Sequence, residues 1–306
     1  MDWNRLGPGV QKNVKNSITE LRNFIAPNGE IFYVDAGIGT TRDGSSWGNA
    51  FLTVQEAITA SNALIDWSAD PWLVDNWIFI APGEYAEALT CPYSAHMIGM
   101  GVLGTDTAVE IHPAEGACLS GTGLGLHIEN IRFEVTDASP AIDFGICNNT
   151  MIKGCEIVCG VAGTGTHGIS TETATHLVVV ENTWQYGGGG NGFDYGIYAA
   201  GGADKYFHNC RVERNEILGI ASGGTGIYIA ADCTASEARI IDNVIYVAGA
   251  GKGIDDNNGN SLCIGNRIVV GSGGDAIEHA GGNAKLLDNK VNVNGTVNNE
   301  PDIAND

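Results

Sequence analysis

The amino-acid sequence predicts an all-β solenoid, a parallel β-helix of roughly eight to nine coils stacked along one axis. Two observations carry this prediction. The chain of 306 residues contains 44 glycines but only 8 prolines and has no Gly-X-Y period, a composition typical of an all-β protein dense in turns. In addition, an internal repeat of about 23 to 34 residues runs from residue 128 onwards, and this period is typical of solenoids.

One series of repeated positions has an apolar residue, then any residue, then Asn or Gly. A tight turn between two short strands favours Asn or Gly, because both tolerate left-handed backbone angles. At a rung spacing of about 4.8 Å, asparagine side chains at this position are expected to form an internal hydrogen-bonded ladder. The alternative is surface turns at coincidental intervals. The seven instances end at Asn130, Gly154, Asn182, Asn209, Asn243, Asn266 and Asn289, and the ladder is predicted for Asn182, Asn209, Asn243, Asn266 and Asn289.

A second series interleaves with the first and places a small residue before Ile. Solenoid coils bury apolar side chains against the coils above and below, so each rung needs an inward-pointing aliphatic residue at a fixed place. From each small-Ile pair to the next turn the chain runs about 12 to 16 residues, whereas the return varies from about 11 to 18. Variable loops are therefore expected at one edge of the stack. The pairs are Ala141-Ile142, Gly168-Ile169, Gly196-Ile197, Gly226-Ile227, Gly253-Ile254 and Ala276-Ile277.

The front of the chain has the pattern of a capped solenoid end. Residues 31–35 are typical of a strand and residues 37–48 of a loop. Apolar residues at helical spacing predict an amphipathic helix across residues 51–65, and residues 77–83 predict a buried strand running into a turn. A strand followed by an amphipathic helix keeps the first apolar rung from being left bare.

Four segments in this region resemble the opening of pectate-lyase-like right-handed β-helix proteins. The resemblance extends over roughly residues 31 to 292 and implies a right-handed parallel β-helix with an N-terminal capping helix. It implies little about function, since that family includes polysaccharide lyases, glycoside hydrolases, bacterial surface proteins and phage tail or capsid appendages. The segments are Tyr33-Val34-Asp35-Ala36, Asp43-Gly44-Ser45-Ser46-Trp47, Ala50-Phe51-Leu52-Thr53-Val54-Gln55-Glu56-Ala57-Ile58 and Pro82-Gly83-Glu84-Tyr85.

The sequence predicts three parts: a helical segment of residues 1–30, the β-helix of residues 31–292 and an acidic tail of residues 293–306. Apolar residues at helical spacings between two Pro-Gly-rich breakers predict a short amphipathic helix in the first part. Two roles for this helix remain open, docking on the β-helix or attachment to another subunit or a larger particle. The polar end of the chain is expected to be a loose tail or a lid over the last rung.

The composition narrows the partners and the compartment. With 36 acidic and 15 basic side chains the net charge is −21, which repels phosphate backbones and anionic lipid surfaces, so neither nucleic acid nor a membrane is an expected partner. Residues 1–5 begin no signal-peptide pattern, and no apolar run reaches the ~20 residues that span a bilayer. The chain is therefore expected to be made in a cytoplasm, with its 8 cysteines as reduced, buried thiols.

Catalytic patterns of the fold are incomplete. The segment Thr166-His167-Gly168-Ile169-Ser170 resembles a polygalacturonase motif and Asp255-Asp256 resembles the paired aspartates of that family, but their order along the chain is reversed and the Arg-Ile-Lys partner is missing. The basic residue beside a calcium-binding acidic cluster, as in pectate lyases, is missing too. The CxxxC spacing of Cys155 and Cys159 has no second pair. The sequence thus predicts no metal and no cofactor, and His167 is expected to be a polar residue at a rung edge.

Residues that directly follow the small-Ile pairs are expected to share one outward-facing column. Asp255 and Glu278 would lie one rung apart, near the ~5 Å separation of the carboxyl pair in retaining glycosidases, and their repulsion would raise the pKa of one carboxyl. Tyr198 and Tyr228 would offer adjacent rings for sugar stacking. The alternative is an ordinary solvated face. The column is Asp143, Ser170, Tyr198, Tyr228, Asp255 and Glu278.

Two functional hypotheses follow. The first is a structural component of a phage or virus particle, such as a spike, decoration or tail protein, made in the host cytoplasm. It would contact other virion proteins or its own copies, as a homo-oligomer such as a trimer, and surface polysaccharide. The second is a polysaccharide lyase, glycoside hydrolase or carbohydrate-binding β-helix, with Asp255 and Glu278 as weak catalytic candidates and Tyr198 and Tyr228 as weak binding candidates. The sequence favours the first.

Overall fold

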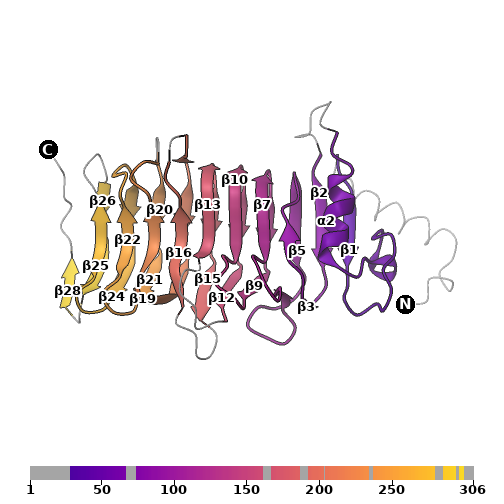
Figure 1. Ribbon diagram of the computed structural model, residues 1–306, viewed down its shortest axis with the longest axis horizontal. Coiled ribbons are helices and arrows are strands. Elements are labelled where there is room, and N and C mark those ends of the chain that lie inside the picture. The colour runs from indigo at the N-terminus through magenta and orange to yellow at the C-terminus, as the bar shows by residue number, and fades with distance from the viewer. Residues whose placement is uncertain are drawn as a thin grey trace, which may run out of the picture.

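The protein is a parallel β-helix whose coils follow one another along a single long axis (Figure 1). The computed structural model describes residues 28–66, 74–160, 167–186, 192–202, 204–233, 237–279, 285–293 and 296–299. Among these, every strand pairing is parallel except the last, in which β28 (Thr296–Asn299) runs antiparallel to β27 (Lys290–Val293). The predicted fold class is therefore confirmed.

One sheet of the described structure contains one strand from each rung. Its 10 strands are short, and successive strands lie far apart in sequence because each is separated from the next by a whole coil. They are β1 (Ile31–Val34), β2 (Asn76–Ile80), β5 (Ala95–Gly99), β8 (His127–Glu129), β11 (Met151–Lys153), β14 (Val178–Val180), β18 (Arg211–Glu213), β20 (Arg239–Ile241), β23 (Leu262–Ile264) and β26 (Lys285–Leu287).

The other sheet has 18 strands, which pair along two rows that share the strand β19 (Glu216–Ile229). We call these the first row and the second row. The first row contains β4 (Leu89–Thr90), β7 (Leu119–Leu124), β10 (Ile142–Asn148), β13 (His167–Thr175), β16 (Phe193–Ala199), β17 (Phe207–His208), the end of β19, β22 (Lys252–Asp256) and β25 (Asp275–His279). The second row contains β3 (Gly83–Tyr85), β6 (Val109–Ile111), β9 (Arg132–Val135), β12 (Glu156–Cys159), β15 (Thr183–Tyr186), the start of β19, β21 (Val244–Val247), β24 (Arg267–Val270), β27 and β28.

The helix α2 (Val54–Asn62) covers the N-terminal end of the stack. Thr53 and Glu56 form a capping box at its start: the Thr53 hydroxyl accepts from the Glu56 N–H at 3.2 Å, and Glu56 Oε2 accepts from the Thr53 N–H at 3.1 Å. Its buried face, which includes Ala57 and Ile58, packs on β1, β2 and β4. The helix predicted as a cap is therefore present, and it is shorter than residues 51–65.

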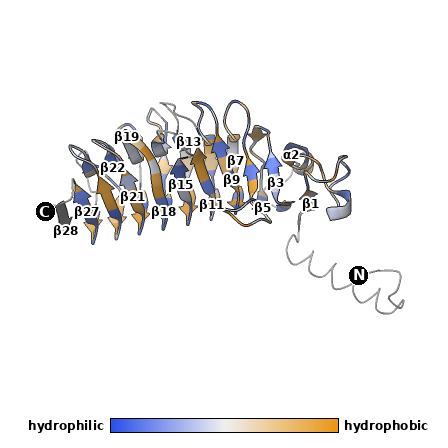
Figure 2. Cartoon of the chain, turned by 90° about the horizontal axis from the view of Figure 1, so that it is seen from below, coloured by the Kyte–Doolittle hydropathy of each residue, from blue (hydrophilic) through white to orange (hydrophobic). Residues whose placement is uncertain are grey.

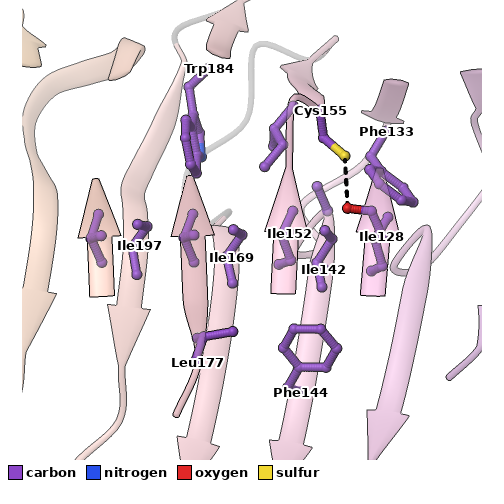
Figure 3. Packing of buried hydrophobic residues seen from close by; sticks show 14 of the residues in the cluster. Ile128, Phe133, Ile142, Phe144, Ile152, Cys155, Ile169, Leu177, Trp184 and Ile197 are labelled. Carbon is purple, nitrogen blue, oxygen red and sulfur yellow. Dashed lines mark hydrogen bonds between the residues drawn. The ribbon is translucent and has the colours of Figure 1, made fainter. Parts of the chain in front are cut away.

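Stacked aliphatic side chains fill the interior (Figure 3). In the close view Ile142, Ile169 and Ile197 follow one another along the axis, as the small-Ile series predicts. The small residue of each pair has a steric cause. A Cβ at Gly226 would lie 2.6 Å from the Gly253 carbonyl oxygen of the next rung, and a Cβ at Gly253 would lie 2.5 Å from the Ala276 oxygen. Strands of both sheets carry hydrophobic residues alternating with hydrophilic ones (Figure 2).

The asparagine ladder exists, but its membership differs from the prediction. Each member after Asn182 accepts, through its side-chain oxygen, bonds from the backbone N–H and the side-chain amide of the asparagine one coil earlier, for example from Asn215 to Asn243 at 3.0 and 2.9 Å, whereas Asn182 accepts from the Cys155 N–H. Asn209 is not a member: it has a φ of 51° in a different turn, and its amide nitrogen lies 2.9 Å from His208 Nε2. The ladder contains Asn182, Asn215, Asn243, Asn266 and Asn289.

The turn motif of the repeat does not distinguish two adjacent positions of the coil, the turn residue with positive φ and the ladder asparagine that follows it. This explains the error at Asn209. Asn130 and Gly154 adopt positive φ, as do Arg214 and Asp242, which directly precede ladder asparagines. When Asn209 is counted in place of Asn215, the half of the coil from the small-Ile pair to the next turn has a nearly constant length. Connections in fact lengthen at a second edge too, for example between β16 and β17 and between the end of β19 and β20. The expectation of variable loops at only one edge is therefore wrong.

The two ends of the chain were predicted as separate parts. Residues 1–27, which contain nearly all of the predicted amphipathic helix, and the Gly-rich stretch of residues 187–190 lie outside the described residues. Within the predicted tail, β28 extends the second row by pairing with β27. Part of the tail is therefore a strand. Among the described helices, none is both long and apolar enough to cross a bilayer.

The cysteines are side chains of the interior. All 8 lie among the described residues, none of them forms a disulfide, and all are buried, as expected. Burial raises the pKa of the Cys155 and Cys263 thiols to about 12, which keeps them protonated and unreactive at neutral pH. Figure 3 shows Cys155 pointing at the Ile128 carbonyl oxygen of the preceding coil.

Ion pairs on the outward face of the 10-stranded sheet link neighbouring strands and turns. Glu213 is held by Arg211 at 2.7 Å and by Arg214 at 3.5 Å, and the hydrogen bond from Arg211 lowers the pKa of Glu213 below its ordinary value of 4.5. A lowered pKa stabilises the fold above pH 4.5, and this contribution is lost as the pH falls further. Replacing Glu213 with Gln is therefore expected to cost about 1 kcal/mol at pH 7 and much less at pH 3, measured by urea unfolding at both pH values. An equal loss at both pH values would contradict this assignment.

Candidate functional site

The outward column predicted from the sequence lies on the first row. Backbone pairing places Asp143 beside Ser170, Ser170 beside Tyr198, Tyr198 beside Tyr228, and Tyr228 beside Asp255. Asp255 in turn pairs with Glu278 on the last strand of the row. The register of the column is therefore as predicted, and the alternation of the strands turns its side chains away from the core.

A second outward column lies beside the first and was not predicted. In four successive rungs the residue before the small-Ile pair and the residue after it both lie on the outward face of the sheet. The residue before the pair belongs to the second column, in which His167 pairs with Tyr195, Tyr195 with Thr225, and Thr225 with Lys252. A usable signal was present in the sequence, because the unit x-Gly-Ile-x recurs with polar or aromatic residues at both ends.

Four rings from these two columns form one aromatic cluster. Tyr198 and Tyr228 are stacked, with ring centroids 5.3 Å apart and an interplanar angle of 5°. His167 stacks on the other side of Tyr198 at 4.5 Å. Tyr195 packs edge-on against both tyrosines at 5.0 and 5.3 Å. We call His167, Tyr195, Tyr198 and Tyr228 the aromatic cluster; all four are partly exposed.

Burial favours the uncharged form of three members of the aromatic cluster, Tyr195, Tyr228 and His167. Burial raises the pKa of Tyr195 and of Tyr228, so both hydroxyls remain hydrogen-bond donors. Burial lowers the pKa of His167, which favours its neutral imidazole. His167 Nδ1 is buried and has no hydrogen-bond partner among the described residues. The cluster thus offers a continuous surface of packed rings together with the neutral hydroxyls of Tyr195 and Tyr228.

A charged triad continues the site towards the C-terminal end. Lys252 Nζ lies 2.7 Å from Asp255 Oδ2 and 2.5 Å from Glu278 Oε2. Burial alone would lower the pKa of Lys252, but the hydrogen bonds to the two carboxylates outweigh it and raise the pKa above its ordinary value. Asp255 is only 4% exposed and also accepts from Asn257 Nδ2 at 2.8 Å. We call Lys252, Asp255 and Glu278 the charged triad.

The charged triad changes the expected role of the carboxyl pair. Asp255 and Glu278 lie one rung apart as predicted, but a lysine ammonium lies between them and binds both. Retaining hydrolysis needs one carboxyl that holds a proton and one free carboxylate. The Lys252 ammonium lies within ion-pair distance of both carboxylates, so neither of them is a free carboxylate, although its single positive charge balances only one of the two negative charges. The expected repulsion between the two is therefore replaced by attraction to Lys252, which the sequence reasoning did not consider.

The polygalacturonase-like residues are not brought together. His167 lies on β13 and Asp255 on β22, three rungs away and thus about 14 Å along the axis. Asp256 is buried at a turn, where its carboxylate accepts from the backbone N–H groups of Gly259 and Ser261, each at 3.0 Å. Asp256 is therefore a structural residue, and the two adjacent aspartates do not form a catalytic pair. Over the described part of the chain, no group of three or more His, Cys, Asp or Glu side chains is arranged to hold a metal ion.

Comparison with known proteins gives the family and little more. A model of the "right handed beta helix region" matches residues 115–291. No curated protein sequence matches the chain. Among solved structures, a pectin methylesterase from carrot is similar at 14% identity with a TM-score of 0.40, over 82% of this chain and 83% of the esterase chain. Because the family model covers more than half of the sequence, the protein belongs to the right-handed β-helix family.

Proposed function

We propose that the protein binds an uncharged oligosaccharide on the outward face of the first row. The observation that carries this proposal is the aromatic cluster, in which four rings from three successive rungs lie on one rigid sheet. Carbohydrate sites combine ring faces that cover the apolar sides of sugars with a few polar groups that fix their orientation. Here the hydroxyls of Tyr195 and Tyr228 supply those polar groups.

Charge supports a neutral glycan over an acidic one. The chain carries −21, and the lysine nearest the aromatic cluster, Lys252, is already bound by two carboxylates. A polyanion such as a polygalacturonate would meet repulsion with no free cation to offset it at this site. The edge of the charged triad instead presents carboxylate oxygens, including those of the half-exposed Glu278, which accept hydrogen bonds from sugar hydroxyls.

Two other functions predicted from the sequence, glycan hydrolysis and a role in a virion, have less support than glycan binding. Hydrolysis by Asp255 and Glu278 has less support than binding, because Lys252 forms ion pairs with both carboxylates and leaves neither of them free. A role in a virion stays a prediction, since one of the features that motivate it, the segment of residues 1–30, lies almost wholly outside the described residues. Binding of a surface polysaccharide is compatible with either setting.

Titration calorimetry with single oligosaccharides tests the proposal. Neutral hexasaccharides of glucose, mannose and xylose are compared with an acidic oligogalacturonate of the same length. We expect binding of at least one neutral hexasaccharide, with affinity lowered about tenfold by Tyr198→Ala, because losing one stacked ring removes about 1.4 kcal/mol. Tyr228→Ala is expected to weaken binding to a similar extent.

Tyr246→Ala is the matched control, since it removes an exposed tyrosine from the second row. Its affinity for the same hexasaccharide should equal that of the unaltered protein. Equal affinity in Tyr198→Ala and Tyr246→Ala would refute the site, and stronger binding of the acidic oligomer would refute the neutral specificity. Any turnover of a bound glycan is checked by adding Asp255→Asn and Glu278→Gln, which lose activity only if the carboxyl pair is catalytic.

A further inference from the structure

The second row has an exposed apolar groove that no described segment covers. Tyr186, Leu218 and Tyr246 line it, with 59%, 37% and 48% of their surface exposed, and Val269 extends it along the axis. The groove has a volume of about 690 Å³ and adjoins a second hollow of about 330 Å³ beside β27. Large exposed apolar surfaces of this kind mark interaction sites.

The same face is acidic at its N-terminal end. Arg132 is surrounded by three carboxylates, those of Glu110 at 3.2 Å, Glu134 at 2.6 Å and Glu156 at 3.3 Å. One guanidinium against three carboxylates leaves two negative charges uncompensated on β6, β9 and β12. Burial raises the pKa of Glu110, as expected for a carboxylate in an overcrowded acidic site.

The C-terminal end of this face is basic. Arg267 on β24 and Lys290 on β27 are paired neighbours in the sheet, and both side chains are exposed. Neither forms an ion pair with any residue that the structure describes. In a chain of net charge −21, two unpaired cations side by side at the edge of an apolar groove are unusual. The second row therefore runs from an acidic end, through a groove whose only charge at the level of Leu218 among the described residues is the exposed Glu216, to a basic end.

We infer that this face binds a second copy of the same chain in antiparallel orientation. A two-fold axis through the groove near Leu218 would bring Leu218 against its own copy and Tyr246 to the level of β15. Arg267 would then lie at the level of β12, and Lys290 at the level of β9, where Glu134 and Glu156 carry the uncompensated charge. A parallel arrangement would instead place acidic end on acidic end and basic end on basic end, which charge repulsion opposes.

Cysteine cross-linking tests both the contact and its direction. The native cysteines are all buried, so an added surface cysteine is the accessible thiol of the described structure. Leu218→Cys lies at the proposed axis and is expected to form an intersubunit disulfide in high yield under mild oxidation. Val269→Cys is the matched control: it lies two rungs from Leu218, so its two copies would be about 19 Å apart and beyond disulfide reach.

The outcomes separate the alternatives. The unaltered protein should sediment at twice its mass of 32.0 kDa, and the double replacement Arg267→Glu with Lys290→Glu should weaken the dimer at least tenfold at low salt. Efficient cross-linking of Val269→Cys would indicate a parallel assembly and overturn the proposed direction. A monomer at all concentrations would overturn the proposal and leave the groove to another partner. Neither outcome bears on glycan binding by the aromatic cluster, which lies on the other row.

Discussion

Replacing Asn243 with alanine is expected to lower the free energy of unfolding by about 4 kcal/mol. Asn243 occupies the centre of the asparagine ladder and is fully buried. Its side-chain oxygen accepts from the backbone N–H and the amide of Asn215, and its amide donates to the Val212 oxygen at 2.9 Å and to Asn266 at 2.9 Å. Alanine would leave two donors and a carbonyl unpaired in the core, each at a cost of about 1 to 3 kcal/mol.

The ladder transmits this loss to neighbouring coils. Nearest-neighbour contacts hold a solenoid together, so a break at one rung loosens the rungs on both sides. Urea unfolding measures the free energy, and hydrogen exchange should show reduced protection of the Asn215 amide, whose acceptor is removed.

Asn209→Ala is the control for this experiment. Asn209 was predicted to belong to the ladder, but its side-chain amide lies within hydrogen-bond distance of His208 instead. Asn209→Ala should therefore lower the free energy of unfolding by only about 1 kcal/mol, the cost of placing alanine at a φ of 51°. If both variants lost a comparable free energy of unfolding, the buried ladder hydrogen bonds would not be the reason why Asn243 stabilises the protein.

Much of the fold was accessible from the sequence because solenoid repeats impose local rules. A small residue must precede the inward Ile wherever the next rung's carbonyl passes within about 2.6 Å, as at Gly226, so the small-Ile series marked correctly the six rungs from β10 to β25 but not those before them. The turn series was less reliable. Left-handed positions accept Asn, Gly, Asp or even Arg214 when the surrounding coil fixes them, so residue type alone could not separate a turn residue from its ladder neighbour.

The candidate site was predictable in its register and only partly in its chemistry. A strand alternates its side chains, so Tyr198, Tyr228, Asp255 and Glu278 could be placed in one column from spacing alone. The backbone pairing skips the small residue of each pair, for example between Lys252 and Ile254, so simple alternation fails there and residues three apart, such as Lys252 and Asp255, meet. Lys252 reaches Asp255 three residues later in the sequence, and this contact places a cation beside the two carboxyl groups that were expected to repel each other.

The two proposals assign a different partner to each outward face: a glycan to the first row and a second copy of the chain to the second row. The first row presents neutral rings and satisfied charges, whereas the second row presents an apolar groove between unbalanced charges of opposite sign. A dimer formed through the second row would leave both first rows open. Two glycan-binding faces per dimer would then allow bivalent attachment to a polysaccharide, which strengthens binding without any new contact.

Replacing Lys252 with methionine is expected to lower the free energy of unfolding by about 3 kcal/mol at pH 7, because it strands the nearly buried carboxylate of Asp255 beside Glu278. Lys252→Arg keeps a cation within reach of both and should cost under about 1 kcal/mol. Lys285→Met, an exposed lysine on the other sheet, controls for the loss of a surface charge.

The matching double variant identifies the cause of that loss. When Asp255→Asn is added to Lys252→Met, the buried charge that needed the lysine is gone, and the half-exposed Glu278 can be hydrated. The double variant should therefore be more stable than Lys252→Met alone, with a coupling of about 2 kcal/mol in the thermodynamic cycle measured by urea unfolding. Strictly additive losses would show that Lys252 acts through packing of its stem. In that case Asp255 and Glu278 would behave as carboxylates independent of Lys252. The main argument against a catalytic Asp255–Glu278 pair would then no longer hold.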